Sequence, residues 1–235
     1  MITTRTAGLL GAAVVLLAGC GGGGSDDFAQ QSPNAIASAA SADMKDLTSL
    51  RMQGDLTTGG QKIGVDMVIT TSGDCQGTIK VGDGSAQIVS SGGHAYMKPD
   101  KTFWESQAPS NAAQIEAVVG DKWVVIPSGT DLSAACDLTQ MLDGVDKPGA
   151  IPSSAPSNSS VESVNGQDAV KLVGKDDNGK PLTAWVAVDD PHYILKMQVT
   201  EGTQPGTIEF SDFDKSVSIQ APSSDQIIDL SKLGG

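Results

Sequence analysis

Two series of short apolar runs, separated by glycine-rich turns, place the strongest constraint on what this chain can fold into. In the first run Ile63, Val65 and Met67 alternate with more polar residues, a period of two that gives a β-strand one dry and one wet face. The first series comprises 63–69, 75–81, 86–90 and 94–98, and the second comprises 161–164, 169–173, 182–188, 194–200 and 207–213. Together they predict a large, curved antiparallel sheet.

The turns between these runs support hairpin connections. Gly82-Asp83-Gly84, Asn165-Gly166 and Asp177-Asn178-Gly179 supply residues that tolerate a positive φ, which tight hairpins need. Consecutive strands should therefore pair as neighbours.

Segments with helical spacing precede and interrupt the strands. Pro33 marks a helix start, and apolar residues recur every three or four positions over Ala35–Leu50. Helical spacing also occurs around Phe103-Trp104, at 112–119 and at 132–142, with the apolar segment 123–126 between them. We expect these helices on the apolar side of the sheet, which makes the fold class α+β.

The N-terminus has the features of an export signal. Arg5 precedes an apolar run, 7–18, that is too short to span a bilayer, and the run ends in Leu17-Ala18-Gly19-Cys20. This ending resembles the lipobox of bacterial lipoproteins, in which the cysteine is acylated, by palmitate among other chains, and becomes the mature N-terminus. The alternative is an ordinary secretory signal with a coincidental cysteine.

Changes in composition along the sequence predict three segments. We expect residues 1–19 to be a removable signal peptide, 20–32 a lipidated Cys20 with a flexible tether, and 33–235 a single domain. Within the domain, residues 148–160 are rich in proline and serine and predict a low-complexity surface loop.

Two cysteines remain once Cys20 is acylated. In the oxidising exterior, Cys75 and Cys136 form the one intramolecular bridge available, and two buried free thiols are the alternative.

Charge and residue types disfavour several function classes. The chain has 28 acidic and 15 basic residues, a net charge of −13, which argues against nucleic-acid binding through a basic patch. Its two imidazoles, His94 and His192, follow turn residues, and no Gly-x-Ser-x-Gly elbow occurs. We therefore expect no catalytic residues, no metal and no cofactor, and hold a hydrolase as a minor alternative.

Methionines are interspersed among the aliphatic residues of the expected apolar face, at positions 67, 97, 141 and 197. Methionine fills irregular core gaps, and the same flexibility suits a cavity for acyl chains. Periodicity alone leaves a filled core and a ligand cavity both open.

A set of motifs spread over residues 35–221 resembles the LppX/LprAFG family of actinobacterial lipoproteins. The motifs are Val81-Gly82-Asp83-Gly84, Tyr96-Met97-Lys98-Pro99-Asp100 with Phe103-Trp104, Val119-Gly120-Asp121-Lys122-Trp123-Val124, Asp189-Asp190-Pro191-His192-Tyr193 and Phe210-Ser211-Asp212-Phe213-Asp214. The resemblance implies a LolA-like fold, an open half-barrel of antiparallel strands with helices in its mouth. It also implies a non-enzymatic carrier or chaperone of envelope lipids or glycolipids.

Two functional hypotheses follow. In the first, the chain is a monomer anchored to the extracytoplasmic face of the cell membrane and binds acyl chains, covered by the first helix and 132–142. The lipid-binding residues on the concave sheet face are then Ile63, Val65, Met67, Ile69, Ile79, Val81, Leu195, Met197, Val199, Ile208 and Phe210. In the second, the core is filled and the domain is an interaction or sensor module that recognises an envelope protein.

The anchor hypothesis predicts the behaviour of one variant. Cys20→Ala removes the acylation site, so the protein should move from the membrane fraction to the medium. Fractionation followed by immunoblotting measures this, and a variant that stayed with the membrane would contradict the anchor.

Overall fold

The computed structural model describes residues 24–127, 136–145, 147, 150–154, 161–176 and 178–232. The strands of the first half are β1 (Ser49–Thr58), β2 (Gln61–Thr70), β3 (Cys75–Val81), β4 (Gly84–Ser91), β5 (His94–Pro99) and β6 (Trp123–Ile126). Those of the second half are β7 (Val161–Val164), β8 (Gln167–Lys175), β9 (Pro181–Ala187), β10 (Ile194–Val199), β11 (Gly206–Ser211) and β12 (Ile227–Ile228). All nine runs that the sequence assigned to strands are strands.

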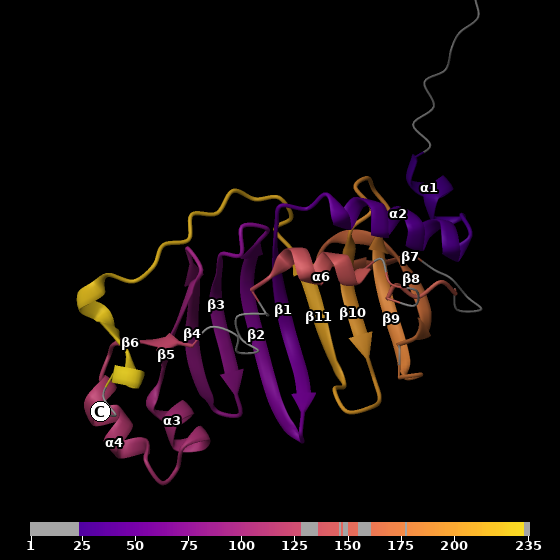
Figure 1. Cartoon of the computed structure of the whole chain (residues 1–235). Coiled ribbons are helices and arrows are strands. Elements are labelled where there is room, and N and C mark those ends of the chain that lie inside the picture. The colour runs from indigo at the N-terminus through magenta and orange to yellow at the C-terminus, as the bar shows by residue number, and fades with distance from the viewer. Residues whose placement is uncertain are drawn as a thin grey trace, which may run out of the picture.

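The strands form one 12-stranded open sheet in the order β12-β6-β5-β4-β3-β2-β1-β11-β10-β9-β8-β7 (Figure 1). Neighbouring strands are antiparallel, except that β12 pairs with β6 in parallel. Hairpins connect β1 through β5 and β7 through β11, and the pairing of β1 with β11 joins the two halves. The expected α+β class with a large open antiparallel sheet is confirmed.

Within the described residues, five α-helices accompany the sheet: α1 (Gly24–Ala29), α2 (Pro33–Lys45), α3 (Lys101–Gln107), α4 (Ala112–Val119) and α6 (Leu138–Val145). Two single-turn 3₁₀ helices, η1 (Ser224–Gln226) and η2 (Leu230–Lys232), flank β12. Local sequence explains the starts of two α-helices. The Ser32 hydroxyl accepts from the Ala35 N–H ahead of α2, and the Asp100 carboxylate accepts from the Phe103 N–H ahead of α3. Of the described residues, none belongs to a helix long and apolar enough to cross a membrane.

The helix predicted over Ala35–Leu50 is wrong at its C-terminal end. α2 stops at Lys45, and β1 begins at Ser49. Leu47 and Leu50 are nevertheless buried, so their hydrophobicity reflects packing in the core rather than a continuing helix. β1 was missed because its first apolar residue, Leu50, was assigned to the end of that helix. Leu50, Met52 and Leu56 do alternate with Arg51, Gln53 and Asp55, a period of two that is interrupted at Gly54.

The predicted flexible tether is also shorter than expected. Residues 24–29 form α1, and Phe28 is only 4% exposed. An aromatic side chain that finds a buried site stabilises the surrounding segment, even where the composition is otherwise typical of a linker. Residues 20–23 lie outside the described part of the chain.

The low-complexity loop at 148–160 is partly incorporated into the core. Ile151 is 8% exposed, and Ser154 forms a two-bond β-bridge with Val173. Pro148, Gly149 and residues 155–160 lie outside the described residues, so the structure tests this prediction only at 150–154.

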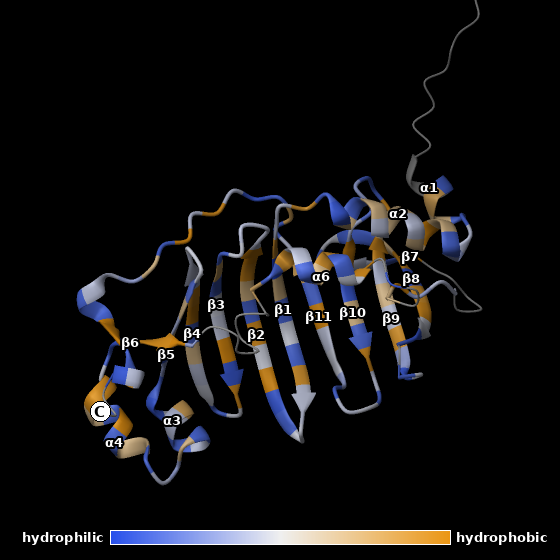
Figure 2. Cartoon of the chain, viewed as in Figure 1, coloured by the Kyte–Doolittle hydropathy of each residue, from blue (hydrophilic) through white to orange (hydrophobic). Residues whose placement is uncertain are grey.

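The core lies between the sheet and the pair α2 and α6. We call the sheet face that these helices cover the inner face. It buries Leu50, Met67, Ile69, Ile88 and Leu172 against helix residues Ile36, Ala40, Met44, Leu138 and Leu142. Figure 2 shows hydrophobic segments along the strands beneath α6.

A disulfide between Cys75 and Cys136 fastens the segment before α6 to the first residue of β3. The two Cα atoms are 5.4 Å apart, and both cysteines are buried. The bridge therefore fixes the N-terminal end of one of the two covering helices. Residues 132–135 of the predicted helix lie outside the described part.

Replacing both cysteines, Cys75→Ser with Cys136→Ser, should lower the free energy of unfolding by about 4 kcal/mol, because the bridge closes a loop of 61 residues. Urea unfolding measures the loss. A reducing agent should destabilise the parent to a similar extent and leave the double variant unchanged; equal stability of both proteins without reductant would contradict the prediction.

Candidate functional site

The inner face carries two unbroken rows of non-polar residues that cross eight strands. Residues paired directly across an antiparallel ladder point to the same face, so the register determines each row. The middle row consists of Ala86, Ile79, Val65, Gly54, Ile208, Met197, Ala184 and Leu172. The end row, two residues nearer the β1–β2 hairpin, consists of Gly84, Val81, Ile63, Leu56, Gly206, Val199, Leu182 and Gly174.

Exposure differs along these rows. Ala86, Ala184 and Leu172 of the middle row are fully buried, whereas Ile63 and Val81 of the end row are only partly buried. A band of apolar surface therefore continues from beneath the helices to a partly uncovered edge of the inner face.

An apolar cavity of about 200 Å³ lies between the covering helices and the strands β10 and β11. Its walls are Met44, Met141, Leu142, Gly144, Val145, Ala150, Ile151, Ile194, Met197 and Phe210. None of these side chains is titratable or carries a hydrogen-bond donor. These walls can therefore hold hydrocarbon.

The structure distributes the eleven predicted lipid-binding residues unequally. Met197 and Phe210 line the cavity. Ten of the eleven lie on the inner face, five of them packed in or against the core cluster: Met67, Ile69, Ile79, Met197 and Phe210. Ile63, Val65, Val81, Val199 and Ile208 belong to the two rows and are partly exposed.

Leu195 is the exception, and its predicted place on the inner face is wrong. The register between β9 and β10 shifts after Ile194, which pairs with Val186, because Lys196 pairs with Trp185. This bulge turns Ile194 inward and places Leu195 in a second, separate cluster with Trp185. Strict alternation cannot anticipate such an extra residue.

Sequence reasoning missed several walls of the cavity. The covering role of α2 and α6 was expected, and Met44, Met141 and Leu142 lie in the segments predicted to form the cover. Ile151 was not found, because it is a single aliphatic residue among prolines and serines. A lone aliphatic residue in an otherwise polar loop is the signal that could have indicated its burial.

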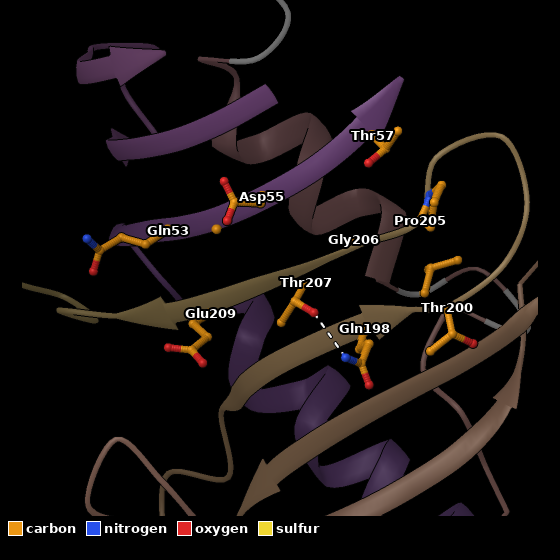
Figure 3. Close-up of a pocket in the computed structure, with 11 residues that line it drawn as sticks. Gln53, Asp55, Thr57, Gln198, Thr200, Pro205, Gly206, Thr207 and Glu209 are labelled. Carbon is orange, nitrogen blue, oxygen red and sulfur yellow. Dashed lines mark hydrogen bonds between the residues drawn. The ribbon is translucent and has the colours of Figure 1, made fainter. Parts of the chain in front are cut away.

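The opposite, outer face has a larger but polar hollow, shown in Figure 3. It measures about 700 Å³ and lies over β1, β11 and β10, where Gln198 donates to the Thr207 hydroxyl at 3.1 Å. Gln53, Asp55 and Glu209 also line it. Such a surface suits water better than hydrocarbon.

Among the described residues, one group of side chains could together ligate a cation. Asp43, Asp190 and His192 offer ligand atoms that lie within 4.8 Å of one another. One oxygen of Asp43 is already engaged, since it accepts from the His192 backbone N–H at 2.7 Å.

Two titratable groups with displaced pKa values, Tyr193 and Asp214, lie near the start of β1. Burial and a hydrogen bond to Asp214 raise the pKa of Tyr193 to about 12. Burial opposes ionisation of Asp214, but hydrogen bonds from the Thr48 N–H at 2.7 Å, the Thr48 hydroxyl and Tyr193 lower its pKa on balance. These bonds fix the chain after β11 to the start of β1.

Comparison with solved structures places this fold among known ones. LprF from Mycobacterium bovis superposes with a TM-score of 0.56 at 14% identity, over 82% of this chain and 97% of LprF. Lipoprotein LppX from Mycobacterium tuberculosis superposes with a TM-score of 0.51 at 17% identity, over 80% of this chain and 98% of LppX. The chain shares their fold. No protein-family model matches the sequence, and no curated protein matches it either.

The phenol of Tyr193 should titrate near pH 12 rather than pH 10. Because the folded protein holds this proton more tightly than the unfolded chain, stability should fall as the pH rises from 10 towards 12. Ultraviolet titration of a Tyr96→Phe variant, in which Tyr193 is the one tyrosine, measures the pKa. Adding Asp214→Asn should bring it closer to 10, and an unchanged pKa would contradict the assigned cause.

Proposed function

We propose that this protein is a lipid-anchored lipoprotein of the extracytoplasmic membrane face that binds lipid or glycolipid acyl chains against its inner face. In this role it carries or shields envelope lipids and catalyses no reaction. The observation that carries the proposal is the apolar cavity between α2, α6, β10 and β11, whose wall includes Met197 of the middle row.

The size of the cavity limits what it holds. A dry apolar cavity of about 150 Å³ is large enough for benzene, so one of about 200 Å³ accommodates a short part of an acyl chain. The rest of the chain would lie along the two rows towards the partly exposed end row. Each buried methylene contributes about 0.8 kcal/mol, so about ten of them along the cavity and the rows would contribute about 8 kcal/mol without any polar contact.

Three further features support the proposal. The fold is that of LprF and of lipoprotein LppX. The sequence ending at Cys20 resembles a lipobox, and two or three acyl chains on that cysteine would hold the domain at the membrane. His94 is exposed beside a turn and His192 stacks on Phe28, so neither imidazole is placed beside the cavity as a general base.

A second function has its own supporting observation. The cavity is smaller than the roughly 300–1,000 Å³ typical of small-molecule sites, and Ile36, Leu138 and Leu172 fill much of the space under the helices. A largely filled core fits an interaction or sensor module of the envelope. The experiment below separates the two.

Met197→Trp places a bulky ring in the cavity and should weaken binding of a fluorescent fatty-acid analogue by about tenfold or more, since steric mismatch in an apolar pocket costs about 1–3 kcal/mol. Titration of the probe into Cys20→Ala protein, recovered from the medium without detergent, measures the affinity. Lipids extracted from the same protein and identified by mass spectrometry report the natural cargo.

Gln198→Trp is the matched control, because it adds the same side chain at the next residue of β10 but on the outer face. It should leave probe binding unchanged. Absence of both bound lipid and probe binding in the parent protein would favour the interaction module.

A further inference from the structure

Phe28 connects the N-terminal segment to the body of the domain. Its ring stacks on that of His192 with centroids 3.6 Å apart and planes within 2° of parallel, and its side chain is 4% exposed. Phe28 lies only eight residues after Cys20 in a segment otherwise rich in glycine, serine and aspartate. Nothing in that composition requires the segment to bind the domain.

His192 is itself held in place from two sides. Its backbone N–H donates to Asp43 Oδ2 of α2 at 2.7 Å, and its Nδ1 lies 3.2 Å from the carbonyl oxygen of Ala187 at the end of β9. The stack therefore joins α1, α2 and the turn between β9 and β10.

Little slack remains between α1 and α2. The Gln31 N–H donates to the Phe28 carbonyl at 3.0 Å, and Ser32 caps α2 directly afterwards. A pull on α1 is thus transmitted to the domain through the Phe28 stack and through this short connection, rather than absorbed by a loop.

We infer that the stack of Phe28 on His192 is a clamp that sets the distance between the domain and the lipid surface to which Cys20 is anchored. The inference rests on the proposed acylation of Cys20 but not on lipid carriage. With the clamp closed, only four residue steps separate Cys20 from the start of α1 at Gly24, a reach of at most about 14 Å. With the clamp open, the reach extends to Pro33 and is at most about 45 Å.

The clamp also selects which part of the domain meets the bilayer. α1 and the turn between β9 and β10 lie at one corner of the sheet, whereas α3, α4 and β6 lie towards the opposite edge (Figure 1). Asp27 and Asp190 at the anchored corner are exposed. Their charge does not favour anionic lipid, so we assign the contact to the acyl chains and the short tether.

The test measures the distance between the domain and the membrane. Acylated full-length protein carrying a donor dye at Ala42→Cys, an exposed position of α2, is reconstituted into phosphatidylcholine vesicles that contain an acceptor-labelled lipid. Energy transfer is compared for the parent, Phe28→Ala and His192→Ala. His94→Ala is the matched control, because it removes the other imidazole, which is exposed on β5. Ten Gly/Ser residues inserted after Gly23 provide a long-tether reference.

We expect Phe28→Ala and His192→Ala to increase the mean distance by roughly 10 Å, towards the long-tether reference, because a flexible chain spans about 5–6 Å times the square root of its length. His94→Ala should match the parent. Thermal unfolding shows whether each variant remains folded, and His192→Ala keeps the test valid if Phe28→Ala does not.

Suppose that energy transfer is unchanged in folded Phe28→Ala and His192→Ala but falls when the Gly/Ser residues are inserted. That result would overturn the clamp proposal, and Phe28 would then only contribute to packing. A parent protein that fails to bind vesicles would overturn the anchor and the clamp together. Neither result bears on whether the inner face binds acyl chains, which the probe titration measures separately.

Discussion

The apolar inner face of the sheet is the constraint on which the rest of the structure depends. Hairpins place Ile79, Val65, Ile208 and Met197 in direct register, so their side chains form one continuous hydrophobic row. Such a surface must be covered, because exposed apolar area costs about 25 cal/mol per Å². α2 and α6 provide that cover, and the Cys75–Cys136 bridge fixes α6 beside the sheet. The cavity is the space that this cover leaves unfilled.

Most strands were predicted from their alternation, whereas β1 was missed. β2, β3 and β10 alternate clearly and end at glycine-rich or polar turns. β1 alternates as well, but its start was assigned to the preceding helix. It pairs with β2 along its whole length and with β11, whose paired residues are 150–160 positions away, over 51–56. Long-range partners of this kind leave no trace in a local pattern.

The candidate site was partly predictable for a related reason. Met197 and Phe210 belong to alternating strands, so their face followed from the pattern, and both line the cavity. Leu195 fits the same alternating pattern but lies on the outer face, because a bulge follows Ile194. Ile151 and Phe28 come from segments whose average composition is polar. Whether a single apolar residue in such a segment is buried depends on the space that the rest of the fold leaves for it.

By itself the sequence determined the α+β class, the hairpin order of most strands and the apolar character of one sheet face, because these depend on periodicity and turn residues that act locally. Tertiary structure alone decided the pairing of β1 with β11, the outward turn of Leu195 and the docking of Phe28 on His192. It also decided that a space of about 200 Å³ remains beneath α6. These features depend on contacts between distant segments, whose fit is set by volume and register rather than by the order of residues along the chain.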